Sequence, residues 1–161
     1  MNAKQILGLG TLVFVGGGAY YFMKQVSLFK AMNVRIVNAV PTKVTSSSVD
    51  VDFEVQITNP SDFDAYITSL NLDIIVEGQN VANVSRTFES NKIILKGEVG
   101  FIKLSTSFNP ASALAGSIIG VLDNLWSGSA FNINVRGQLN GGSKFFKLAD
   151  YPINEDVSVI G

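Results

Sequence analysis

The sequence predicts an all-β protein: an antiparallel β-sandwich with one helical insertion, preceded by a single transmembrane helix. Two observations predict it. Short runs of alternating apolar and polar residues recur from residue 33 onward, separated by Gly, Asn and Pro turn signals. Ahead of them lies an uncharged apolar run. We therefore divide the 161-residue chain into a short tail (1–5), a transmembrane helix (6–23), a basic juxtamembrane linker (24–32) and the sandwich domain (33–161).

The apolar run at residues 6–23 reads ILGLGTLVFVGGGAYYFM and lies between Lys4 and Lys24. Its 18 residues would rise about 27 Å as a helix, close to the ~30 Å hydrocarbon core of a bilayer. Tyr20 and Tyr21 stand near its end, where amphipathic rings prefer the membrane interface. The alternatives are a cleaved signal peptide and a buried core helix. No small-x-small cleavage site follows the run, so we favour a retained single-pass anchor.

Charge is unevenly distributed along the chain. Residues 1–48 contain five bases and no acid, whereas residues 49–161 contain all 13 acids and the other seven of the 12 bases. The bases after the apolar run favour a domain on the cytoplasm-like side, or contacts with anionic headgroups from either side, so sidedness stays open. We expect Lys24, Lys30 and Arg35 to contact the membrane or a partner. An acidic domain is unsuited to nucleic acid, whose binding depends on neutralising phosphates.

The residue types for most enzyme chemistry are missing. The chain has no cysteine and no histidine. This excludes disulfides, thiolate sites, a lipidated cysteine anchor, the commonest general base and the Ser-His-Asp triad. Paired carboxylates or a lysine remain possible, but the spacing shows no cleft that would unite them. We expect no catalysis, no cofactor and no metal.

The first two strands are the clearest in the pattern. Residues 34–40 predict a strand that ends at Pro41. In residues 49–58, VDVDFEVQIT, odd-numbered positions are apolar and even-numbered positions are polar, which predicts a half-buried antiparallel strand. Pro60 ends it because proline cannot donate to a sheet ladder, and Asn59 suits the turn because its side chain can bond the local backbone.

The remaining strands follow with turn signals at regular intervals. ITSLNLDIIVEG stops at Gly78, VANVSRTF is a weaker strand, and KIILKGEVGFIKLSTSF predicts two strands around Gly97. FNINVRGQL and KFFKLADY flank residues 140–143, a strong hairpin signal, and VSVI adds a possible last strand. Six to eight short strands indicate a sandwich of the immunoglobulin/fibronectin-like kind.

One helix is expected between the strands. Asn109 suits its N-cap, Pro110 its first position and Gly128 its C-terminal cap. Apolar residues at helical spacing would form one face: Leu114, Ile118, Val121, Leu122 and Leu125.

The order of these motifs resembles the late-embryogenesis-abundant (LEA) type 2 domain, also called the water-stress and hypersensitive-response (WHy) domain. The resemblance covers residues 33–160 and rests on "ITNPSDFDAYI", "LNLDIIVEGQNVANV" and "FNINVRGQL". It departs at Ser61 and Asp62, where the family often carries Asn. It implies a β-sandwich without catalytic residues, often membrane-tethered, with a stress-protective role. The matching positions are Val55, Ile57, Asn59, Pro60, Phe63, Ile67, Leu70, Leu72 and Gly78.

Two aromatic positions are candidates for contact with a membrane or a partner. Lys144, Phe145, Phe146 and Lys147 form a basic-aromatic cluster beside the predicted hairpin. The alternative is that one phenylalanine belongs to the core and the other is partly exposed. Trp126 ends the predicted helix and is either an interface residue or a lid on the core.

Acidic side chains also gather, but we expect no cation at either place. Asp50, Asp52 and Glu54 share one strand face and are most simply a solvated surface. Asp62 and Asp64 are too few for a calcium site without further oxygen ligands.

We expect a membrane-anchored, non-enzymatic β-sandwich that acts as a binding or structural module at a membrane surface, with the bilayer bound through residues 6–23. The alternative is a structural subunit of a larger membrane-associated assembly, such as a cell-envelope complex or a membrane-containing virion, with a protein partner. Such a subunit should expose an apolar patch around Phe145, Phe146 and Trp126.

Overall fold

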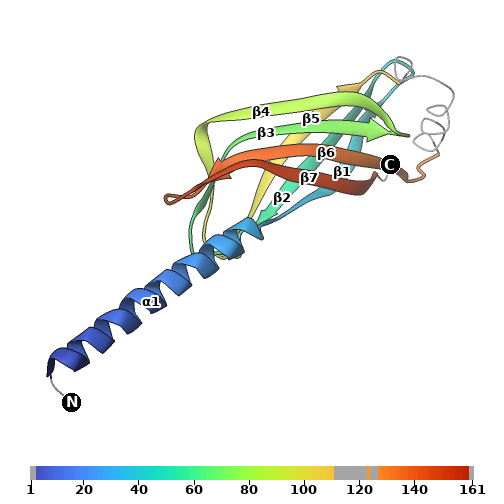
Figure 1. Ribbon diagram of the computed structural model, residues 1–161. Helices are drawn as coiled ribbons and strands as arrows, with labels where there is room; N and C mark the ends of the chain where they lie inside the picture. Colours follow the sequence, from blue (N-terminus) through green and yellow to red (C-terminus); the bar gives the residue numbers. More distant parts are fainter. Residues whose placement is uncertain (1–2, 111–122, 124–126, 160–161) are drawn as a thin grey trace.

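A computed structural model describes residues 3–110, 123 and 127–159 of the chain. Within this part, one helix precedes seven strands, and the helix extends like a rod from one end of the strands (Figure 1). The helical insertion expected between Asn109 and Gly128 falls mainly on residues 111–122 and 124–126, outside the described part. The elements are α1 (Ala3–Lys30), β1 (Asn33–Val44), β2 (Val49–Thr58), β3 (Ala65–Val76), β4 (Gln79–Ile94), β5 (Val99–Phe108), β6 (Phe131–Gly142) and β7 (Lys147–Val159).

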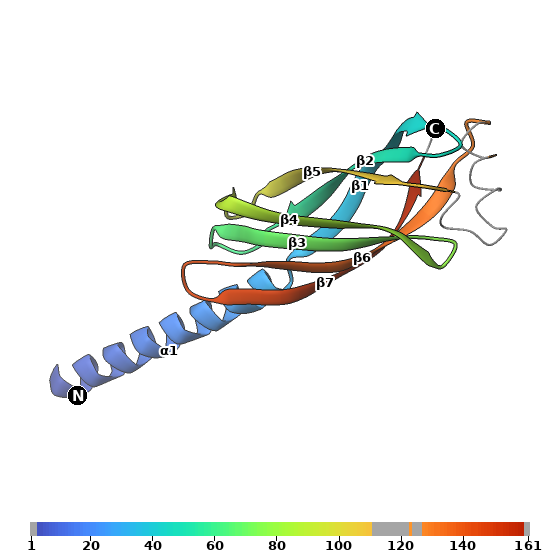
Figure 2. The same ribbon diagram turned by 90° about the horizontal axis from the view of Figure 1, so that it is seen from above.

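The strands form two antiparallel sheets, in the orders β1-β2-β5 and β4-β3-β6-β7. Figure 2 shows the two layers and the helix leaving them at one end. We call this the helix end of the sandwich. Three connections lie there: the β2–β3 loop (59–64), the β4–β5 turn (95–98) and the β6–β7 turn (143–146). The expectation of antiparallel sheets packed as a sandwich is confirmed.

The core lies between the sheets and follows the alternation of the sequence. In β2, all five odd-numbered residues from Val49 to Ile57 are at most 2% exposed. In β3, the even-numbered residues from Leu70 to Val76 are equally buried and face them from the other sheet. Because side chains of a strand alternate between its two faces, this period of two fixes which face meets the core.

Because Pro41 lacks a backbone N–H, we expect β1 to end there, but it does not. The strand continues to Val44, and Pro41 lies opposite Val51 of β2. β1 is an edge strand, where proline is tolerated because one side of the ladder is open. The β1–β2 register is irregular both before and after Pro41. Asn38, at the first irregularity, adopts a left-handed conformation with φ 53°.

Two other strand boundaries differ from the sequence pattern. VANVSRTF and the start of KIILK form one strand, β4, and residues 157–159 of VSVI form the end of β7. The β3–β4 hairpin turns at Glu77 and Gly78, with φ 49° and 79°. Positive φ at both central residues matches the primed turn that suits the twist of a hairpin, which explains the glycine at residue 78.

The segment expected to be a basic linker, residues 24–32, is mostly helical. α1 continues without a break to Lys30, and Gln25, Phe29 and Met32 are buried against the sandwich. Burial of this stripe explains why the helix does not end at residue 23. Residues 6–16 of the expected membrane span have a helical backbone, and their side chains lie outside the described part. In the part that is described, no helix combines the length and the apolar character needed to cross a membrane.

Candidate functional site

The last turns of α1 are built into the helix end of the sandwich. Phe22, Gln25, Phe29 and Met32 follow one another at intervals of three, four and three residues, which places them on one side of the helix and its exit. Phe29 is 0% exposed and Met32 is 1% exposed. Burying each of these two side chains contributes about 1.5–3 kcal/mol. The joint between helix and sandwich is therefore a packed interface.

The β2–β3 loop is organised by Asn59, which is completely buried. Its Nδ2 donates to the carbonyl oxygen of Phe63 at 2.7 Å and to those of Ile94 and Leu95, each at 3.3 Å. Its Oδ1 accepts from the backbone N–H of Ser61 at 3.2 Å and from the Ser61 hydroxyl at 2.7 Å. Asn59 thus joins the β2–β3 loop to the end of β4, and the expected bonding of its side chain to the local backbone is present.

Asp62 connects this loop to the helix. Its backbone N–H donates to Gln25 Oε1 at 2.8 Å, and Gln25 Nε2 donates back to Asp62 Oδ2 at 2.8 Å. The Tyr21 hydroxyl donates to the same carboxylate oxygen at 2.6 Å. Asp62 therefore supplies a charged acceptor for two donors of α1.

Five phenylalanines contact one another at the same joint. Phe63 lies 6.0 Å from Phe22, 5.0 Å from Phe145 and 6.0 Å from Phe146, measured between ring centroids. Phe22 lies 6.0 Å from Phe145, and Phe29 lies 4.6 Å from Phe146 with the rings nearly perpendicular. Tilted and edge-to-face pairs at these distances add about 0.5–1.5 kcal/mol each beyond area burial. We call these five residues the junction cluster.

A further hydrogen bond connects the end of the helix to β7. The Tyr151 hydroxyl of β7 donates to the carbonyl oxygen of Met32, in the connection between α1 and β1. The helix is thereby attached to both sheets: to the β2–β3 loop through Asp62 and to β7 through Tyr151.

An open groove of about 520 Å³ lies beside the junction cluster. Its lining includes Phe63, Ile93 and Phe145, and it also includes the lysines Lys96 and Lys144. The Asp64 carboxylate on the same groove accepts the backbone N–H of Lys96 at 3.1 Å. The groove thus combines apolar walls with two ammonium groups at the helix end.

The structure separates the predicted contact residues into two groups. Phe145 and Phe146 join the junction cluster, where Phe146 is half-buried and Phe145 is 57% exposed. This is the division between one inner and one outer phenylalanine that the sequence left open. Trp126 lies outside the described residues. The predicted basic contacts are all exposed: Lys24, Lys30, Arg35, Lys144 and Lys147.

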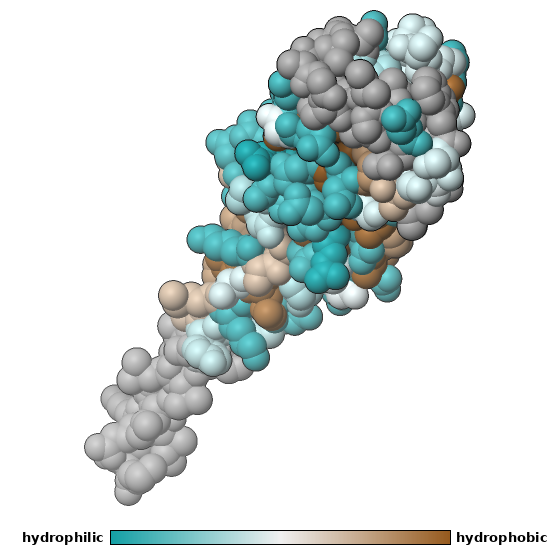
Figure 3. Space-filling view, turned by 90° about the vertical axis from the view of Figure 1, so that its right-hand side faces the viewer, coloured by the Kyte–Doolittle hydropathy of each residue, from teal (hydrophilic) through white to brown (hydrophobic). Residues whose placement is uncertain are grey.

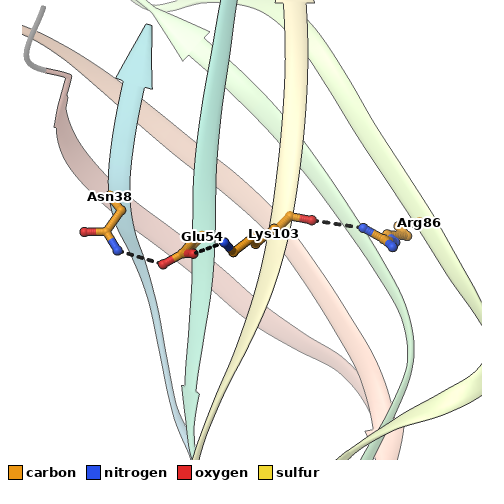
Figure 4. A network of polar contacts seen from close by, with 4 residues as sticks. All are labelled: Asn38, Glu54, Arg86 and Lys103. Atoms are coloured by element: carbon orange, nitrogen blue, oxygen red, sulfur yellow. Dashed lines mark hydrogen bonds and ion pairs between the residues drawn. The ribbon is translucent and has the colours of Figure 1, made fainter. Parts of the chain in front are cut away.

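The acidic face of β2 is occupied by local hydrogen bonds. Figure 4 shows Glu54 between two neighbouring strands: Asn38 Nδ2 donates to Glu54 Oε2 at 2.7 Å, and Lys103 Nζ lies 3.6 Å from Glu54 Oε1. Arg86 of β4 donates to the carbonyl oxygen of Lys103 at 2.9 Å. Within the described residues, no group of three or more Asp and Glu side chains is arranged to hold a metal ion.

Sequence reasoning missed the helix side of the site. Tyr21 and Phe22 were assigned to the membrane span, and Gln25 and Phe29 to a linker. The 22–25–29–32 spacing was the available signal, but it crosses the boundary drawn at residue 23, where the uncharged run ends. Tyr151 carried no local signal, because its partner is the carbonyl oxygen of a residue 119 positions away.

Comparison with protein-family profiles finds no match, and comparison with curated protein sequences finds none either. Solved structures do match. One is a solution structure of a protein provisionally assigned as late embryogenesis abundant: it is 11% identical, with a TM-score of 0.52, and the match covers 98% of this chain and 86% of that one. The chain has an LEA-like fold.

Two further structures agree with this fold. A solution structure of the Arabidopsis thaliana protein AT1g01470 is 12% identical, with a TM-score of 0.50, and the match covers 80% of each chain. A Bordetella pertussis protein provisionally named ApaA is 14% identical, with a TM-score of 0.52, over 80% of this chain and 92% of that one. At these identities the similarity concerns the LEA-like fold and not the activity.

Proposed function

We propose that the protein is a membrane-anchored, non-enzymatic β-sandwich of the LEA type 2 (WHy) kind, with immunoglobulin/fibronectin-like architecture, that acts as a binding or structural module at a membrane surface. The observation that carries the proposal is the packed joint: α1 passes from the apolar run directly into the sandwich, held by Gln25, Phe29 and Asp62. Such a joint presents the sandwich in a fixed pose at the end of its anchor.

The chemistry of the chain supports a role without catalysis. It has neither histidine nor cysteine. The carboxylates nearest the groove are engaged in structure, because Asp62 accepts from two side chains of α1 and Asp64 accepts a backbone N–H. A groove of this kind suits binding better than acid–base catalysis, which needs a titratable group free to exchange a proton.

Membrane extraction tests the anchor. The full chain is expressed in cells, and isolated membranes are washed with alkaline carbonate, which removes peripheral proteins. We expect the protein to stay in the membrane pellet. The double substitution Leu12→Lys and Val15→Lys should release it, because each charge near the middle of a span costs about 2.5–3.5 kcal/mol. The conservative pair Leu12→Val and Val15→Leu serves as the control. Release of the unchanged protein by carbonate would overturn the proposed anchor.

The LEA type 2 resemblance adds a stress-protective role to the proposal. Survival of the host after drying, with and without the gene, tests it: a protective protein should raise survival only when the anchor is intact. Equal survival of both strains would remove stress protection from the proposal and leave the membrane module.

A further inference from the structure

Exposed apolar side chains gather at the helix end of the sandwich. Ile93 is 61% exposed, Leu95 57% and Phe145 57%. Val99 and Phe101, just after the β4–β5 turn, are 42% and 47% exposed. We call these five residues the collar. Among the described residues, the other exposed large apolar side chains are residues 20–23 of α1 and Val40.

Hydrophobic side chains are visible on the surface beside the helix. In Figure 3, brown and tan atoms lie next to the helix among hydrophilic ones, and further brown atoms lie higher on the sandwich. Single exposed apolar residues are normal on a protein surface, but a group of them around one structural feature marks a place of contact. Here the feature is the point at which α1 leaves the sandwich.

The joint fixes the depth of Phe145, one residue of the collar, relative to the apolar run. Tyr21 bonds Asp62, and Phe22 contacts Phe63 and Phe145. Tyr21 lies two residues before Met23, the end of the run, which is about 3 Å along a helix axis. When α1 spans a bilayer with this run, the loop of Phe63 and the turn of Phe145 are therefore at the level of the headgroups.

Charged side chains around the collar match this position. Lys92, Lys96, Lys144 and Lys147 are all exposed and lie within or next to the β4–β5 and β6–β7 turns. Long lysine side chains can extend from apolar surroundings to lipid phosphates. Three carboxylates lie at the same end of the sandwich: Asp62 and Asp64 of the β2–β3 loop, which accept hydrogen bonds within the protein, and Glu98 of the β4–β5 turn, which is exposed.

We propose that the collar is a membrane-contact surface, and that it penetrates the headgroup layer of the bilayer into which α1 inserts. This inference rests on the proposed membrane anchor. The bilayer is the occupant favoured here because the collar lies at the helix end of the sandwich, where the contact of Phe145 with Phe22 sets the depth of the β6–β7 turn. The groove beside the junction cluster then opens toward the headgroups, with Lys96 and Lys144 placed to meet a phosphate.

Depth measurements with single cysteines test the collar on the full chain. The protein contains no cysteine, so each introduced thiol can be labelled alone with a nitroxide. Leu95→Cys and Phe145→Cys report on the collar, and both side chains are exposed. Ser47→Cys, in the exposed β1–β2 turn away from the helix, is the matched control for water, and Leu12→Cys reports on the anchor.

The labelled proteins are reconstituted in vesicles of phosphatidylcholine with phosphatidylglycerol, and accessibility to oxygen and to a water-soluble nickel chelate is measured by paramagnetic resonance. We expect labels at residues 95 and 145 to lose most of their nickel accessibility and keep oxygen accessibility, whereas a label at residue 47 keeps both. Lys96→Gln with Lys144→Gln should make the label at residue 95 shallower in these vesicles and leave it unchanged in pure phosphatidylcholine.

The outcomes separate the collar from the anchor. A label at residue 12 in lipid with labels at 95 and 145 fully open to nickel would overturn the collar and leave the anchor standing. A label at residue 12 open to nickel would overturn both. Labels at 95 and 145 shielded from oxygen as well as nickel would also overturn the lipid contact, because only protein packing excludes both reagents, and would assign the surface to a second copy or a protein partner.

Discussion

Gln25 and Asp62 hold each other by two hydrogen bonds in opposite directions, although 37 residues separate them. The Asp62 N–H donates to Gln25 Oε1 and Gln25 Nε2 donates to Asp62 Oδ2, each at 2.8 Å. An amide side chain can do this because it carries an acceptor and a donor side by side. Gln25 is 4% exposed, so the pair is shielded from water on the helix side. It sets the angle at which α1 leaves the sandwich.

Replacing Gln25 by alanine should loosen the joint without unfolding the sandwich. Two hydrogen bonds are lost, one of them to a carboxylate, and we expect a cost of about 1–3 kcal/mol in the free energy of unfolding. Amide hydrogen exchange of the full chain in detergent micelles should show faster exchange at Asp62 and unchanged exchange in the core of β2. Gln79→Ala, at the exposed start of β4, is the control. Unchanged protection at Asp62 would contradict this role of Gln25.

Asn59→Asp should strongly destabilise the domain, although the two side chains are nearly equal in size. The substitution exchanges the Nδ2 donor for an oxygen that faces the carbonyls of Phe63, Ile94 and Leu95. A buried acceptor placed against acceptors loses its bonds and adds repulsion, so we expect a loss of at least about 3 kcal/mol at neutral pH. Urea unfolding followed by circular dichroism measures it. Asn80→Asp, at an exposed position near the start of β4, should change stability little, and equal effects of the two variants would argue against the central role of Asn59.

Whether a feature of the fold can be predicted from the sequence depends on how far apart along the chain the interacting residues lie. The alternation of residues 49–58 predicted β2 and its buried face, because the period of a strand is local. Asn59-Pro60 predicted the end of the strand, and the Asn59 bond to Phe63 lies within the same loop. Its bonds to Ile94 and Leu95 could not be predicted, since they depend on how two distant strands meet.

The joint between helix and sandwich was hidden for a different reason. The hydropathy of the sequence places the end of the apolar run at Met23, because charged residues follow it. The helix continues to Lys30, since the burial of Phe29 against the sandwich stabilises the helical conformation there. At Pro41 the sequence predicts the end of a strand, but the strand continues. Proline is unfavourable inside a central strand, whereas an edge strand such as β1 leaves one row of backbone groups unpaired and so tolerates proline. The position of a strand within its sheet cannot be predicted from the sequence of that strand alone.

Gly137 should tolerate alanine less well than Gly78 does. A Cβ at Gly137 would lie 2.0 Å from the backbone oxygen of Asn71 in the neighbouring strand, so the β3–β6 pair would have to separate. We expect about 3 kcal/mol for Gly137→Ala, the upper end of the usual cost of overpacking. Gly78→Ala has open space around it and carries only the strain of φ 79°, about 1–2 kcal/mol. Thermal unfolding of the two variants compares them, and a larger loss at Gly78 would contradict the strand contact.

Asp50 should titrate below the usual range because two hydroxyl groups stabilise its charged form. Ser107 Oγ donates to Asp50 Oδ1 at 2.6 Å, and Ser48 Oγ donates to the same oxygen at 2.7 Å. These hydrogen bonds, that of Ser107 first, lower the pKa of Asp50 from its ordinary value of 3.8. Because the folded state has the lower pKa, the stabilising contribution is complete above the unfolded pKa and disappears as the pH falls through the folded pKa.

Ser107→Ala should therefore raise the pKa of Asp50 toward 3.8 and flatten the dependence of stability on pH in the acid range below that value. A carbon-detected titration of the Asp50 carboxyl group measures the pKa directly. Ser105→Ala, exposed on the same strand and opposite Asp52, is the matched control and should leave the pKa of Asp50 unchanged. If Ser107→Ala also leaves it unchanged, the hydroxyl of Ser107 is not what holds the carboxylate in its charged form.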